Sequence, residues 1–144
     1  MRRWFVLTAV LVTQLWTFVF ANEITVYKSP SCGCCKKWVT HLEQNGFIVT
    51  SHDVESIVPV KQKHGVLPQL GSCHTGLIDG YVIEGHVPAD DIKRLLKEKP
   101  AVAGLAVPGM PVGTPGMEQG NRKDSYQVLS FDRSGNIQVF AEYK

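Results

Sequence analysis

This sequence has little excess of either sign of charge and no basic patch. Its 144 residues include 15 Lys and Arg and 13 Asp and Glu. Arg2 and Arg3 lie at the extreme N-terminus, and without them the two signs are equal in number. Nucleic-acid binding needs clustered cations, often interleaved with aromatic residues. We therefore expect no nucleic-acid partner.

Cysteine is also scarce, with four residues, and no second Cys-x-x-Cys pair follows the first. Zinc sites of four cysteines usually contain two such pairs, so the composition favours another metal over zinc. An even cysteine count suits disulfides in an oxidising compartment. The neighbours Cys34 and Cys35 cannot bond to each other without strain, because disulfide geometry is narrow. The spacing therefore does not predict a simple disulfide framework.

The N-terminus has the features of an export signal. Arg2 and Arg3 precede an uncharged stretch from Trp4 to Phe20, and Val19-Phe20-Ala21 fits a small-residue cleavage rule. The alternative is an uncleaved anchor, although the run is at the short end of the roughly 17–25 residues that span a bilayer. We expect a signal peptide at residues 1–21 and a single exported domain at 22–144, without stable membrane insertion after cleavage.

Hydrophobic periodicity and turn residues predict an α/β domain with the element order β-α-β-α-β-β-α. The expected strands and helices are, in order, Ile24–Lys28, Cys34–Asn45, Phe47–His52, Ser56–His64, Thr75–Ile78, Tyr81–Glu84 and Ala89–Lys99. A long loop rich in Gly and Pro (101–123) follows, and Tyr126–Phe131 and Ile137–Tyr143 are expected to form a C-terminal hairpin. The hairpin would extend the sheet or hold the loop against the body.

This order resembles the thioredoxin and glutaredoxin fold over residues 24–99. Proteins of that fold place a cis-proline before the third strand, facing the Cys-x-x-Cys motif. Here Ser72-Cys73-His74-Thr75 takes that place, and the nearest proline is Pro68. We therefore expect a side chain that can bind a metal to face the motif.

The cysteine cluster is the clearest sign of chemistry. Cys32 and Cys35 are one helical turn apart, which suits a reversible disulfide, two ligands of one metal or a structural disulfide. A helix N-terminus also stabilises thiolates. Cys34 distinguishes these interpretations, because a third thiol invites wrong pairing in an oxidoreductase but adds a ligand to a metal site. Soft sulfur ligands select Cu(I), and a small thiolate-bridged cluster accommodates three such neighbours more easily than a single ion does.

Other candidate ligands lie further along the chain. Cys73 alone would be read as a buried core cysteine, but opposite the motif we interpret it as a ligand. His74 follows it directly, and in an extended segment the two side chains point to opposite faces, so both reach one site only if the backbone is irregular. His86 is open to three interpretations: a ligand, a residue of a helix start, or an exposed side chain. We expect the remaining histidines at the surface: His41, His52 and His64.

Methionine is rare, and both residues beyond the initiator lie in repeated Pro-Gly-Met units of the long loop, at Met110 and Met117. Methionine is usually core filler, yet this loop does not read as core. Thioethers are neutral soft ligands, so we predict a copper role for at least one of the two. The loop would then close over the cysteines as a lid.

Four segments together resemble the exported CopG-type copper-resistance proteins of bacteria, a thioredoxin-like family. The segments are Ser31–Cys35, Ser72–Thr75, Gly80–Ala89 and Val107–Glu118. The resemblance implies a periplasmic copper-binding protein that acts in metal tolerance, with copper as its partner and other periplasmic copper-handling proteins as candidate partners. By position, the implied ligands are Cys32, Cys34, Cys35 and Cys73, followed by His86, Met110 and Met117.

The leading hypothesis is therefore a periplasmic Cu(I)-binding protein that stores copper, transfers it or cycles its redox state. The rival hypothesis is a thiol–disulfide oxidoreductase of the glutaredoxin type that uses Cys32 and Cys35. A periplasmic zinc-binding module is a third interpretation. The sequence leaves open whether the protein is an enzyme.

Overall fold

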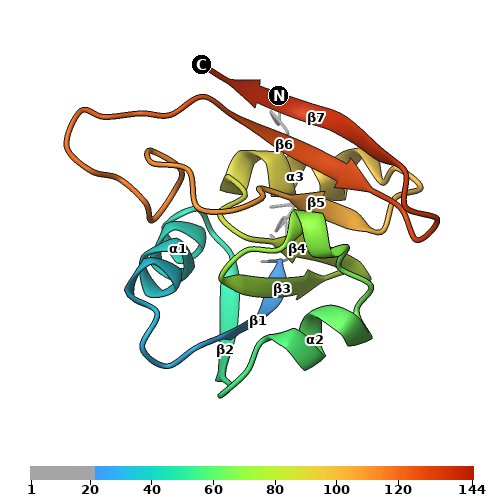
Figure 1. Cartoon of the computed structure of the whole chain (residues 1–144), viewed down its shortest axis with the longest axis horizontal. Coiled ribbons are helices and arrows are strands. Elements are labelled where there is room, and N and C mark those ends of the chain that lie inside the picture. Colours follow the sequence, from blue (N-terminus) through green and yellow to red (C-terminus); the bar gives the residue numbers. More distant parts are fainter. Residues whose placement is uncertain (1–21) are drawn as a thin grey trace, which may run out of the picture.

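The computed structural model describes residues 22–144 and contains the element order expected for the core (Figure 1). The helices are α1 (Gly33–Gln44), α2 (Val58–Lys63) and α3 (Ala89–Glu98), with a short 3₁₀ turn η1 (Pro68–Leu70). None of the helices in this part of the chain is long and apolar enough to cross a membrane. The predicted signal peptide at 1–21 lies outside the described residues.

Seven strands form one sheet in the order β2-β1-β3-β4-β5-β6-β7. Their bounds are β1 (Glu23–Lys28), β2 (Ile48–Asp53), β3 (His74–Ile78), β4 (Tyr81–Glu84), β5 (Gly104–Ala106), β6 (Tyr126–Phe131) and β7 (Ile137–Tyr143). The pairs β1–β2 and β4–β5 are parallel, and the other neighbours are antiparallel. The predicted α/β fold is confirmed, and the C-terminal hairpin extends the sheet.

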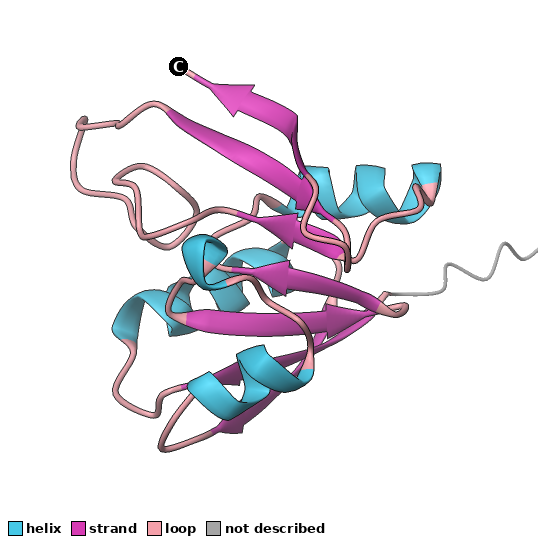
Figure 2. Ribbon diagram, turned by 45° about the vertical axis from the view of Figure 1, so that its right-hand side comes forward, coloured by secondary structure: helices cyan, strands magenta, loops and turns pink. Residues whose placement is uncertain are grey.

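Helices cover both faces of this sheet. Figure 2 shows α2 in front of the strands, with α1 and α3 behind them. The side chains of neighbouring residues in β4 pack on opposite faces of the sheet. Ile83 belongs to the core under α1 and α3, and Val82 belongs to a smaller cluster on the other face. This division follows from the alternation of side chains along a strand.

One expectation about the fold was wrong. The segment 101–123 was predicted as loop throughout, but it contains β5, which joins the core sheet to the hairpin. Gly104 is required there, because a Cβ on it would lie 1.9 Å from the Val82 carbonyl oxygen. A three-residue strand that begins with glycine has little intrinsic β-propensity, so its neighbours on both sides impose the conformation.

The first helix presents the cysteine motif at its N-terminus. Cys32 is the N-cap residue, and its sulfur accepts a hydrogen bond from the Cys35 backbone N–H at 3.3 Å. Cys35, Trp38 and Leu42 form the buried stripe of α1. The helix ends before Gly46, whose φ of 88° is typical of a helix stop. Burial of this stripe fixes the position of the motif relative to the sheet.

Candidate metal centre

The four cysteine sulfurs lie together at the N-terminus of α1. Cys32 and Cys35 are joined by a disulfide bond, so Cys34 and Cys73 are the free thiols. The Cys34 sulfur lies 3.4 Å from that of Cys32 and 3.9 Å from that of Cys73. All four sulfur atoms lie within 4.8 Å of one another. Cys73, the residue just before β3, therefore faces the motif, as the sequence predicted.

Two buried histidines lie beside Cys73. His74 Nδ1 and His86 Nε2 are each 3.2 Å from the Cys73 sulfur, and the three residues form a second group with metal-ligand spacing. In a regular strand, the side chains of Cys73 and His74 would point to opposite faces of the sheet. Strand β3 begins only at His74, so the backbone at Cys73 is irregular and both side chains reach one region.

The environment holds both imidazoles neutral. Burial, reinforced by the nearby His86 and Lys61, keeps the pKa of His74 well below 6.5. Burial also lowers the pKa of His86, against the opposing effect of the Pro115 carbonyl. Among the described residues, His74 Nε2 is a buried nitrogen without a hydrogen-bond partner. Neutral imidazoles with a free lone pair are the form in which histidine binds metals.

His86 is also oriented from outside the core. Its Nδ1 donates to the Pro115 carbonyl oxygen at 2.8 Å, so Nε2 carries the lone pair that faces Cys73. A hydrogen bond on one ring nitrogen that fixes the ligating tautomer of the other is the common arrangement of metal-binding histidines. Of the three interpretations left open for His86, the exposed one is wrong, because the residue is fully buried.

The long loop between β5 and β6 lies beside α1 (Figure 1), and both of its Pro-Gly-Met units contact segments that carry cysteines. In the first unit, the Gly109 carbonyl oxygen accepts a hydrogen bond from the Ser72 hydroxyl. In the second, Gly116 packs on α1, where an added Cβ would lie 2.8 Å from the Cys34 carbonyl oxygen. Met110 is 52% exposed, whereas Met117 is half-buried. The loop lies over the site, and the thioether roles stay predictions.

Electrostatics discourage an isolated thiolate at Cys73. Burial first, and the adjacent Cys34 second, raise the pKa of Cys73 to about 12. The thiol therefore stays protonated at neutral pH unless a cation compensates the charge of the thiolate. A coordinating metal ion supplies that compensation.

Comparison with known proteins agrees with this geometry. Two solved structures, "Copper resistance protein copG- Form 2" and "Copper resistance protein copG- Form 1", are both 53% identical to this chain. The first has a TM-score of 0.83 and covers 87% of this chain and 100% of its own. The second has a TM-score of 0.82 and covers 86% and 98%. This chain belongs to the CopG copper resistance protein family.

The CopG resemblance expected from the sequence is thus confirmed over nearly the whole described chain. A family model described as "Protein of unknown function, DUF411" matches residues 70–117, which include Cys73, His86 and both Pro-Gly-Met units but not the cysteine motif. No curated protein matches significantly.

Sequence reasoning missed a buried polar network behind the CopG cysteines. Glu84, at the end of β4, is fully buried and accepts hydrogen bonds from the Ser72 backbone N–H at 2.6 Å and from the Thr75 hydroxyl at 2.8 Å. Lys61 of α2 forms an ion pair with the same carboxylate. A glutamate at the end of an apolar strand is usually exposed, so no local signal indicated this pair.

His41 was expected at the surface, but its side chain is half-buried and has a hydrogen-bond partner. Its Nε2 accepts a hydrogen bond at 3.1 Å from the backbone N–H of Ala89, the first residue of α3. The side chain is half-buried between α1 and α3. His41 therefore caps the helix that follows the His86 segment.

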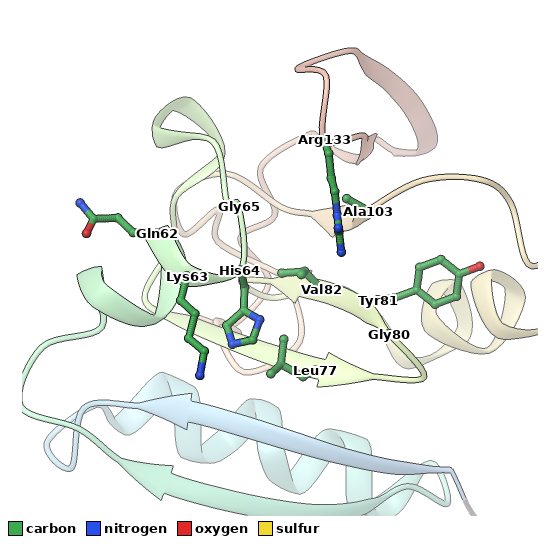
Figure 3. Close-up of a pocket in the computed structure, with 10 residues that line it drawn as sticks. All are labelled: Gln62, Lys63, His64, Gly65, Leu77, Gly80, Tyr81, Val82, Ala103 and Arg133. Carbon is green, nitrogen blue, oxygen red and sulfur yellow. The ribbon is translucent and has the colours of Figure 1, made fainter.

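A separate hollow of about 460 Å³ lies beside the C-terminal end of α2 (Figure 3). Its ten lining residues include Lys63, His64 and Arg133, and none of them is a cysteine. This hollow is thus distinct from the candidate metal centre.

Proposed function

We propose that this chain binds copper as Cu(I) through the thiolates of Cys32, Cys34, Cys35 and Cys73. The observation that carries the proposal is the approach of all four sulfur atoms to within 4.8 Å of one another. Three of them come from four consecutive residues, an arrangement better suited to a multinuclear thiolate-bridged cluster than to one ion. Membership of the CopG family, whose solved structures are named for copper resistance, supports copper as the metal.

The other donors of the site suit the same metal. Sulfur ligands favour Cu(I), and imidazole is a good ligand for copper in general. His86 and His74 present nitrogen atoms to Cys73, so they are proposed to complete the coordination. Met117 and Met110 are proposed as further soft ligands that the loop brings to the metal.

The disulfide adds a redox step to this proposal. While Cys32 and Cys35 are bonded, two of the four thiolates are absent, so full copper binding requires reduction. In the reverse direction, two Cu(II) ions each accept one electron from the Cys32 and Cys35 thiolates, which gives two Cu(I) ions and the disulfide. An exported thiol reductant would then restore the two thiolates. In this scheme the protein reduces Cu(II) to Cu(I) as well as holding copper, and its own thiols are what cycles.

The proposed setting is the periplasm. Cleavage after Ala21 would release the single domain at 22–144, and the partners would be copper ions and other periplasmic copper-handling proteins. An exported location fits a site whose disulfide needs an oxidising compartment to form.

The test is an anaerobic Cu(I) titration of the reduced protein (residues 22–144) against a chromophoric chelator, with metal analysis of the product. We expect tight binding of more than one copper per chain. A Cys34→Ser variant should lose stoichiometric binding, with the thermal midpoint of its metal-free form unchanged. Unchanged binding by this variant would make Cys34 a bystander. Zinc that is retained and resists displacement by copper would argue for the zinc interpretation instead.

A second candidate function is thiol–disulfide exchange. It is favoured by the Cys32–Cys35 disulfide at the N-terminus of a helix, where the Cys35 N–H bonds to the Cys32 sulfur. A helix N-terminus lowers thiol pKa values and so supports this chemistry. An insulin-reduction assay decides it: no rate above background rejects the oxidoreductase, whereas efficient reduction without copper binding would replace the copper proposal.

A further inference from the structure

We propose that Glu84 and Lys61 are positioning residues that hold Cys73 at the metal centre. This inference rests on the proposed copper function. Neither residue contacts the sulfur atoms. They act through the backbone of Ser72, the residue before Cys73.

The first step is how Glu84 grips the segment that carries Cys73. One carboxylate oxygen accepts the Ser72 backbone N–H at 2.6 Å, and the other accepts the Thr75 hydroxyl at 2.8 Å. The two donors flank Cys73 and His74 in the sequence. A single buried carboxylate therefore holds both ends of the short irregular segment that turns Cys73 toward the motif.

The second step is what holds Glu84. Its side chain is fully buried, and a buried carboxylate is costly unless it is paired and hydrogen-bonded. Lys61 supplies the counter-charge, and its ammonium also donates to the Thr75 hydroxyl at 3.1 Å. Since Lys61 comes from α2, the pair connects that helix to the entrance of β3.

The third step is the fit of the neighbouring residues. Gly85, which follows Glu84, has a φ of 72°, and a Cβ there would lie 2.7 Å from the Ser72 Cβ. The missing side chain gives Ser72 room to approach β4. The next residue, His86, faces the Cys73 sulfur. Three consecutive residues thus act on the same segment: Glu84 holds Ser72 by a hydrogen bond, Gly85 leaves room for it, and His86 faces the Cys73 sulfur.

The fourth step is the link to the loop. The Ser72 hydroxyl donates to the Gly109 carbonyl oxygen, while the Ser72 N–H is held by Glu84. Ser72 is consequently fixed from the core on one side and from the loop on the other. Release of Glu84 would loosen both Cys73 and the first Pro-Gly-Met unit.

The experiment compares two double variants that both lack the buried charges. Glu84→Gln with Lys61→Met keeps an oxygen that can accept the Ser72 N–H. Glu84→Met with Lys61→Met removes that acceptor, and apolar replacement of a buried ion pair is often tolerated by the fold. Lys63→Met, on the same helix but outside the network, is the matched control.

The readouts are Cu(I) affinity, hydrogen exchange of the Ser72 amide and the thermal midpoint of the metal-free protein. We expect the double variant with Glu84→Met to lose affinity by about 10- to 100-fold, the usual effect of losing support behind a metal ligand. Its Ser72 amide should exchange about tenfold faster, the equivalent of one lost hydrogen bond. The double variant with Glu84→Gln and the control should stay close to the parent protein in both readouts, at similar midpoints.

Equal copper affinity in the two double variants, or unchanged exchange at Ser72, would overturn the positioning role. If the parent protein itself binds no Cu(I), the proposed function fails, and the exchange comparison still decides whether Glu84 fixes this segment. Should the double variant with Glu84→Met not fold, Glu84→Asp takes its place, because it keeps the charge but is one methylene too short for both contacts. Parent-like exchange and affinity in that variant would also refute the proposal.

Discussion

Replacement of Gly116 by alanine should lift the loop from the metal centre. Gly116 has a φ of 88°, and a Cβ there would lie 2.8 Å from both the Cys34 carbonyl oxygen and the Trp38 nitrogen. Both atoms belong to the backbone of α1, which is held by its buried stripe and cannot retreat. The loop must therefore move, and the bond from His86 to the Pro115 carbonyl would break with it.

The size of the effect follows from two contributions. A positive φ costs a non-glycine residue about 1–2 kcal/mol. Loss of the His86 bond leaves a buried N–H without a partner, at a cost of about 1–3 kcal/mol. Gly116→Ala should thus lower the free energy of unfolding by about 2–5 kcal/mol in sum.

Gly120 offers a matched control in the same loop. Its φ is 56°, but a Cβ there would have no atom within 4 Å. Gly120→Ala should lose only the backbone contribution of about 1–2 kcal/mol. Urea unfolding of the metal-free proteins measures the difference, and Cu(I) titration should show weaker binding for the Gly116 variant alone. Equal destabilisation of the two variants, with equal copper affinity, would refute the closed-loop reasoning.

Three further predictions concern stability. Burial holds the pKa of His41 below 6.5, so the folded state favours the neutral imidazole. The stability that this preference contributes is fully present above pH 6.5 and is lost as the pH falls through the lowered pKa. Urea midpoints between pH about 7 and about 5 should therefore decline less steeply in His41→Gln than in the parent; parallel declines would contradict this. Trp38→Phe removes the 2.8 Å bond to the Val87 carbonyl oxygen and should lower the unfolding free energy by about 1–3 kcal/mol, whereas an unchanged value would mean that water replaces the indole. Tyr143→Phe removes the 2.6 Å bond to the buried Asp91 carboxylate, and a loss of about 1–3 kcal/mol in chemical unfolding is expected, with no loss arguing that the hairpin is not held by this contact.

The sequence predicted those parts of the fold whose signals are local. Strand β4 and both hairpin strands have the predicted bounds, because each is delimited by turn residues. At the first of these turns, Asp79 and Gly80 both adopt positive φ, as an Asp-Gly hairpin turn requires. The spacing of Cys32 and Cys35, one helical turn apart, likewise predicted a cysteine motif at the start of a helix.

Features that depend on residues far apart in the chain could not be predicted in the same way. Strand β5 exists because β4 and β6 lie on either side of it. The pair of Lys61 and Glu84 spans 23 positions and carries no periodic pattern. The His74 side chain reaches the Cys73 sulfur because β3 begins at His74, which leaves Cys73 outside the regular alternation of the strand. In each case the structure depends on contacts with residues distant in the sequence, and the local sequence contains no signal for it.

The loop between β5 and β6 helps to distinguish between the two proposed functions. An enzyme that exchanges disulfides with other proteins needs a sulfur atom that a substrate polypeptide can reach. Here Cys35 is fully buried, while Cys32, Cys34 and Cys73 are half-buried. The loop beside them is attached at Ser72 and at His86, so a substrate polypeptide has limited room at these sulfur atoms. A metal ion needs a much smaller opening. The covering loop therefore favours a small cationic cargo over a polypeptide disulfide as the partner of these cysteines.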